Sequence, residues 1–237
     1  MSLPDEMLKR DLLLNNGLID RVIVDILKVY DANLPYAFIP MGIIGEVLRR
    51  NHGANFTNKE QAVSHLMAIK SVVGWQYFRG IYQVSPDLMN QYAKRPLPKA
   101  LTLEKLCHLP QQVCYFELDH APYQGFYASI DPVVWNDKGS LNTLDLLFIG
   151  LEQEDTPTFM AVQVALDAPM PEWVIGNPEV VKAIQIVLLA SDPDFQVNDR
   201  LGQKSDPYCG NGSPTNKYTR QPITQHYHIC HRPVLAS

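Results

Sequence analysis

The segment "TLDLLFIGLE", residues 143–152, decides the fold that we predict for this chain. It is an almost continuous apolar run, and the turn-forming segment "EQEDTP" (152–157) follows it. A short apolar run that ends in turn signals is typical of a strand buried in a sheet. The segment therefore predicts a core strand, and the neighbouring segments of the chain are candidates for its partners.

Three similar segments surround this strand, namely "QQVCYFEL" (111–118), "GFYASID" (125–131) and "TFMAVQVAL" (158–166). Short turns such as "NDKGS" (136–140) connect them. Antiparallel strands can be joined by a few residues, whereas parallel strands need a crossover connection of a dozen residues or more. We therefore predict an antiparallel sheet from about residue 111 to 166, and we exclude a doubly wound parallel sheet.

The first half of the chain has the pattern of helices. "LIDRVIVDILKVYDAN" (18–33) repeats its apolar residues at spacings of three and four, as one face of a helix requires. A capping-box pattern in "TNKE" (57–60) predicts the start of a second helix, and "SPD" (85–87) predicts a third that ends at "KRP" (94–96). We expect helices from residue 1 to about 95.

One more helix is predicted after the strands. "NPEVVKAIQIVLLASDPD" (177–194) begins with Asn177 as N-cap and Pro178 at the first helical position, and its apolar residues would face the sheet. The residues that follow are polar and rich in Gly and Pro. The sequence thus predicts one α+β domain over residues 1–194, with a helical N-terminal half packed on an antiparallel β-sheet, and an irregular tail over 195–237.

The composition limits the classes of partner. The 25 acidic residues exceed the 20 basic residues and give a net charge of −5, which weighs against an extended nucleic-acid surface. No apolar run approaches the length of a membrane span, and no signal-peptide pattern opens the chain. The four cysteines form no CxxC pair, which agrees with a reducing compartment. We expect a cytoplasmic protein without a membrane partner.

Motifs for the common enzyme classes are missing. The chain contains no GxxxxGK[ST], GxGxxG, GxSxG or HExxH pattern. Glu117, Asp119 and His120 lie at a predicted strand end and Asp131 ends the next strand, an arrangement that also suits an ordinary polar turn. Cys114 lies in an apolar strand and is interpreted as a small buried side chain. We predict no catalytic residues and no cofactor.

Several segments together resemble a known family. They are "LPYAFIPMG" (34–42), "GWQYFRGIYQVSPDL" (74–88), "LPQQVCYFELD" (109–119) with "GFYASID" after it, and "LLASDPDF" (188–195). Their order and spacing resemble the type V-A anti-CRISPR family, whose members oppose the type V-A CRISPR nuclease and whose relatives are carried on plasmids, phages and other mobile elements. The resemblance implies a non-enzymatic inhibitor that binds a protein partner, either the nuclease or its nascent chain.

The resemblance also implies where binding occurs. Arg79 and Tyr82 lie where a predicted helix passes into a loop, and arginine and tyrosine are common anchors of interfaces. In the tail, His226, Tyr227 and His228 keep the order of a His-aromatic-His motif of the family, although the Tyr-Trp that follows it there is missing. These five residues are the predicted binding residues.

Two alternatives stay open. The segment "QHYHICH" (225–231) would place His226, His228 and Cys230 on one side of an extended strand, which suits zinc, but a structural zinc site needs four ligands and only the distant Cys209 could complete the set. We therefore predict no bound metal. A metal-dependent nuclease or hydrolase that uses these histidines with Asp119 or Asp131 is the first alternative function, and an accessory protein that binds RNA or the ribosome is the second.

Overall fold

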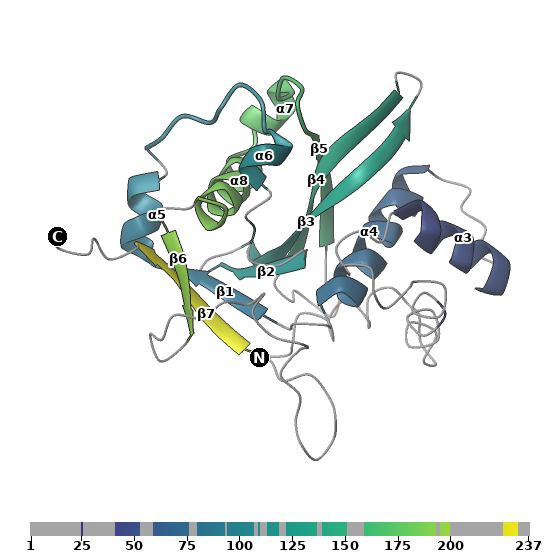
Figure 1. Ribbon diagram of the computed structural model, residues 1–237, viewed down its shortest axis with the longest axis horizontal. Coiled ribbons are helices and arrows are strands. Elements are labelled where there is room, and N and C mark those ends of the chain that lie inside the picture. Colours follow the sequence, from purple (N-terminus) through teal and green to yellow (C-terminus); the bar gives the residue numbers. More distant parts are fainter. Residues whose placement is uncertain are drawn as a thin grey trace, which may run out of the picture.

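A mixed β-sheet with helices on both faces forms the centre of the computed structural model (Figure 1). The structure describes residues 25, 41–52, 59–75, 80–92, 94–106, 109, 113–118, 122–136, 139–150, 159–192, 195–199 and 225–231. Within these residues the sheet has seven strands in the order β5-β4-β3-β2-β1-β7-β6. The strands are β1 (Gly80–Val84), β2 (Val113–Glu117), β3 (Tyr123–Asn136), β4 (Gly139–Gly150), β5 (Phe159–Ala165), β6 (Phe195–Asp199) and β7 (Gln225–His231).

The strands β2 to β5 form the predicted antiparallel meander. Within this set the pairs β2–β3, β3–β4 and β4–β5 are all antiparallel. The segment that opened the sequence analysis contributes most of β4, which lies between β3 and β5. The prediction of a buried strand is confirmed, because Leu144 to Gly150 are all buried.

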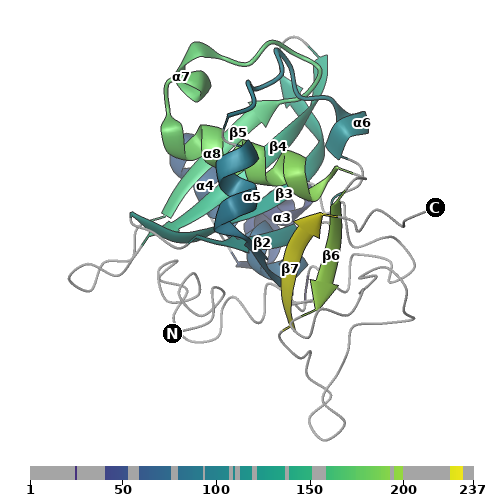
Figure 2. The same ribbon diagram turned by 90° about the vertical axis from the view of Figure 1, so that its left-hand side faces the viewer.

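The helices form two outer layers. They are α3 (Met41–His52), α4 (Lys59–Trp75), α5 (Pro86–Tyr92), α6 (Leu103–Leu106), α7 (Glu172–Ile175) and α8 (Pro178–Ala190). Helices α3 and α4 cover one face of the sheet, and α5 to α8 lie on the other (Figures 1 and 2). The N-cap of α8 is as predicted, since the side chain of Asn177 accepts hydrogen bonds from the backbone N–H groups of Glu179 (3.1 Å) and Val180 (3.2 Å). None of the described helices has the length and apolar content needed to cross a bilayer.

Alternation along the strands builds two separate cores. In β2, Cys114 and Phe116 pack toward α8, whereas Val113 and Tyr115 pack toward α4. Successive side chains of a strand point to opposite faces, so a strand that is covered on both faces becomes apolar throughout. This explains why β4 has the sequence of a continuous apolar run. The α+β architecture with a helical first half is confirmed.

The sheet is not antiparallel throughout, which corrects the prediction. Strand β1 lies in a segment that we expected to be the end of a helix, and it pairs in parallel with β2 on one side and with β7 on the other. A parallel pair is possible because the connection from β1 to β2 runs over residues 85–112 and contains α5 and α6. The short connections that predicted antiparallel pairing are found between β2 and β5.

The prediction of an irregular tail is wrong for two segments after Asp194. Strand β6 pairs with β7 in antiparallel orientation, and β7 pairs with β1 over Gly80 to Val84. The physical reason is the sheet itself: β1 offers a second edge of backbone N–H and C=O groups, and β7 satisfies them. The remainder of the tail and the predicted helix 18–33, apart from the helical Asp25, lie outside the described residues.

Candidate functional site

Two of the predicted binding segments are neighbours in the sheet. Strand β7 carries the His226-Tyr227-His228 motif and lies directly beside β1 (Figure 1). In the register of the pair, Ile81 lies opposite His226, Tyr82 opposite Tyr227, and Gln83 opposite His228. The structure therefore brings together segments that are far apart in the sequence. Only the backbone of the motif is described.

Tyr82 is not at the surface, contrary to the prediction. Its side chain has no exposed area, and it packs on the α8 side of the sheet with a ring-centroid distance of 5.6 Å to Phe116. The error arose because the segment forms a central strand rather than a helix-to-loop junction. Tyr82 is a core residue, and it cannot anchor a partner while the fold is intact. Arg79 lies outside the described residues.

A half-buried polar pair, Gln83 and Glu117, lies on β1 and its neighbour β2. The side chain of Gln83 donates a hydrogen bond to the carboxylate of Glu117 on the neighbouring strand β2. Both residues lie on the face that carries α4, at the end of β1. Burial raises the pKa of the nearby Tyr115, and the negative charge of the Glu117 carboxylate raises this pKa further. This corner of the sheet is therefore one of the polar places on a face whose core is mainly apolar.

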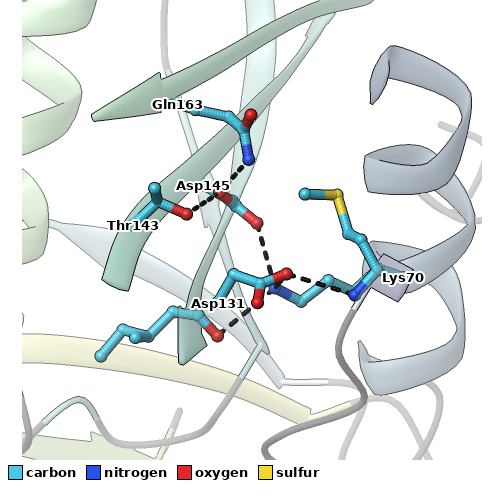
Figure 3. Close-up of polar contacts among 7 residues, drawn as sticks. Lys70, Asp131, Thr143, Asp145 and Gln163 are labelled. Atoms are coloured by element: carbon cyan, nitrogen blue, oxygen red, sulfur yellow. Dashed lines mark hydrogen bonds and ion pairs between the residues drawn. The ribbon is translucent and has the colours of Figure 1, made fainter. Parts of the chain in front are cut away.

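A buried polar cluster surrounds Lys70 of α4 (Figure 3). The Nζ atom of Lys70 lies 3.0 Å from Oδ2 of Asp145 on β4 and 3.4 Å from Oδ2 of Asp131 on β3, and it donates a hydrogen bond to the carbonyl oxygen of Ile130 (3.3 Å). The exposed fractions of the Lys70, Asp131 and Asp145 side chains are 3%, 1% and 3%. We call these three residues the Lys70 cluster.

Neighbouring groups complete the hydrogen bonds of the Lys70 cluster. Oδ1 of Asp145 accepts hydrogen bonds from the hydroxyl of Thr143 (2.8 Å) and the side-chain amide of Gln163 (3.0 Å). Oδ2 of Asp131 accepts one from the backbone N–H of Met41 (3.3 Å), the first residue of α3. A carboxylate at a helix N-terminus is electrostatically favourable. The cluster thus ties α3 and α4 to three strands of the sheet.

This geometry suits a structural role better than catalysis. Charges that are buried, paired and hydrogen-bonded are stable in a protein interior, and a substrate has no access to them. Asp131 was one of the candidates for a hydrolase, and its carboxylate is occupied by Lys70 and by the N-terminus of α3. Among the described residues no group of three or more His, Cys, Asp or Glu side chains is placed to hold a metal ion.

The sequence contained a signal for the Lys70 cluster that we did not use. Lys70 falls among the inward-facing positions of the predicted helix, next to the buried Met67 and Ile69. Asp145 falls in the middle of the apolar run of β4. A lone charge of each sign at two core positions suggests an internal ion pair, because buried charges are rarely left without a partner.

Sequence reasoning also missed an exposed apolar group on α7. The side chains of Trp173 and Ile175 are 54% and 59% exposed, whereas Val174 between them is fully buried. Val174 packs into the core that includes α8, so it holds the short helix against the domain. The signal in the sequence is "EWVI" (172–175), in which only three apolar residues follow Glu172 before Gly176, too few for a core element.

The arrangement of strands and helices can be compared with solved structures. No protein-family model and no curated protein sequence matches the chain. The fold is similar to that of AcrVA2. The crystal structure of AcrVA2 aligns with a TM-score of 0.62 over 95% of this chain and 82% of the AcrVA2 chain, at 15% sequence identity. At this identity the similarity to AcrVA2 is one of fold, and it agrees with the resemblance found in the sequence.

Proposed function

We propose that the protein is a non-enzymatic inhibitor that binds a protein partner, and that the partner is a type V-A CRISPR nuclease or the nascent chain of that nuclease. The observation that carries the proposal is the similarity to AcrVA2, because it extends over 95% of the chain rather than over one common motif. Such an inhibitor would protect a mobile genetic element that enters the cell.

The exposed side chains of α7 support binding to a protein. The Trp173 side chain is more than half exposed, and tryptophan is enriched among the residues that dominate interface energies. The backbone N–H of Gly176 donates to the carbonyl of Glu172 (2.8 Å), and buried Val174 holds the turn in place. Trp173 and Ile175 are therefore presented on a rigid support, which reduces the entropy cost of binding.

The second part of the proposed interface keeps the residues implied by the resemblance. Arg79 directly precedes β1, and His226, Tyr227 and His228 lie in the adjacent strand β7. We retain these residues as an auxiliary contact. Tyr82 is removed from the set because it is buried, and Trp173 takes its place as the expected anchor.

The test is a plasmid-protection experiment in bacteria that express a type V-A nuclease directed against the plasmid. The intact chain should raise plasmid survival, and it should co-purify with the nuclease or with ribosomes that translate it. Measuring the amount of nuclease separates inhibition of its action from inhibition of its production. Absence of protection and of co-purification with every type V-A nuclease tried would contradict the proposal.

Two variants sharpen this test. Trp173→Ala should weaken binding by about 30-fold or more, which corresponds to loss of about 2 kcal/mol at an interface anchor. Leu103→Ala is the matched control, because Leu103 is also an exposed apolar residue, at 39%, on a short helix of the same layer. Both variants should keep the melting temperature of the wild type. Equal affinities of the two variants would exclude α7 as the binding surface.

A further inference from the structure

Strand β5 forms one end of the described sheet, and among the described residues its outer edge has no strand beside it. It pairs with β4 alone, and the hydrogen bond from the N–H of Leu166 to the carbonyl of Asn142 (2.8 Å) sets which residues face β4. Residues with even numbers in β5 direct their backbone groups to β4, so those of Phe159, Ala161, Gln163 and Ala165 point outward. In the described part of the chain no backbone group is hydrogen-bonded to this outer edge.

The free edge lacks the features that usually prevent pairing. Proteins protect exposed edges with charged side chains, prolines, bulges or very short strands. Strand β5, "FMAVQVA", has seven residues and contains no charge and no proline, and its register with β4 is continuous. By contrast, register shifts interrupt the pairing of β3 with β4. An edge of this kind is a template for another strand.

We propose that β5 is an interface between two copies of this chain, in which the two β5 strands pair in antiparallel orientation about a two-fold axis at Val162. With this axis the two strands pair over their full length. Phe159 lies opposite Ala165 of the second copy, and Ala161 lies opposite Gln163 of the second copy. All of these residues have outward-pointing backbone groups. Each therefore exchanges both backbone hydrogen bonds with its counterpart.

The side chains of β5 are complementary in this register. Each larger side chain lies opposite a smaller one, since Phe159 and Gln163 face alanines. On the other face Met160 lies opposite Val164 of the second copy, and Val162 lies opposite itself. No like charges meet, because the strand has no charged residue. The side chains of an identical strand thus fit this edge in size, and no charges repel one another. This favours a second copy of the chain over an unrelated peptide.

The first experiment places a disulfide at the proposed axis. Val162 would form a non-hydrogen-bonded pair with its own copy, with Cα atoms about 4.5 Å apart, which suits a disulfide. Val164→Cys is the matched control, because Val164 is also buried in β5 but would lie roughly 13 Å from its own copy. Under mild oxidation Val162→Cys should give at least about ten-fold more cross-linked dimer than Val164→Cys or the unsubstituted chain.

The second experiment measures the mass of the unsubstituted chain by sedimentation over a range of concentrations. We expect a dimer that Ala161→Pro converts to a monomer, because proline removes an outward N–H and leaves the bonds to β4 intact. A chain that is monomeric at all concentrations would overturn the proposal, as would a dimer without a preferential link at Val162. A monomer whose β5 edge binds a nuclease segment would contradict the second copy as occupant but leave the inhibitor role intact.

Discussion

The two faces of the sheet are stabilised in different ways. On the α8 face the core consists of apolar side chains, among them Phe116, Phe126 and Phe148, whose rings stack or tilt against one another. On the α4 face the apolar core also surrounds the Lys70 cluster. Apolar burial is strong but non-directional, whereas an ion pair with completed hydrogen bonds requires defined positions. We infer that the Lys70 cluster sets where α3 and α4 dock.

The largest effect is expected from Lys70→Met. This change keeps much of the side-chain volume but leaves the carboxylates of Asp131 and Asp145 buried without their cation. Removing one partner of a buried ion pair typically costs about 3 to 5 kcal/mol. Chemical denaturation should show this loss in the free energy of unfolding.

A second substitution tests whether charge is the cause. Adding Asp145→Asn to Lys70→Met removes one of the two uncompensated charges, so part of the lost stability should return. Additive losses in the double variant would mean that packing around Lys70, rather than charge balance, holds the α4 face together.

On the α8 face, Tyr82→Ala should cost about 3 kcal/mol. The change removes a fully buried aromatic side chain and leaves a cavity beside Phe116. The loss should be independent of salt and should appear as a lower melting temperature. An unchanged melting temperature would contradict the position of Tyr82 in the core.

A smaller effect is expected where α4 contacts the sheet. A Cβ atom at Gly74 would overlap Cγ2 of Val113 on β2, so Gly74→Ala should cost about 1 to 2 kcal/mol through overpacking. Val113→Ala makes room for the added methyl group. The double variant should therefore be more stable than the sum of the two single losses predicts, and strict additivity in a double-mutant cycle would exclude this contact.

The smallest effect at neutral pH is expected from Tyr115→Phe, which removes a hydrogen bond to Gln124 worth about 1 kcal/mol. Burial raises the pKa of Tyr115 above the value of about 10 of an unfolded chain. The unfolded state therefore ionises first, so the stability that Tyr115 contributes is complete below pH 10 and falls as the pH rises further.

Denaturation between pH 9 and 11.5 checks the pH dependence. Above pH 10 the wild type should lose stability more steeply than Tyr115→Phe, by up to about 1.4 kcal/mol per pH unit. Parallel curves for the two proteins over this range would show that Tyr115 ionises as easily in the folded state as in the unfolded state.

The local elements were predictable because their signals are local. The apolar runs and short turns of β2 to β5, the first position of α5 at Pro86, and the Asn177 cap of α8 depend on neighbours in the sequence. The same holds for Cys114, which is buried as interpreted. The α+β class follows from this order of elements. The candidate site was predicted less well. The sequence-based prediction named residues in or next to β1 and β7, which do lie side by side, but it placed the buried Tyr82 at the surface.

Contacts between distant segments depended on the tertiary structure. Strand β1 pairs in parallel with β2 and β7, and Lys70 forms ion pairs with Asp131 and Asp145; both contacts join residues far apart in the chain. The exposure of Trp173 likewise depends on how distant elements pack. Hydrophobic periodicity reports which side of an element is buried, but not which element buries it. Five-residue β1 has too short a pattern to distinguish a strand from a helix end, so its place in the sheet was decided by the partners whose backbone groups it satisfies.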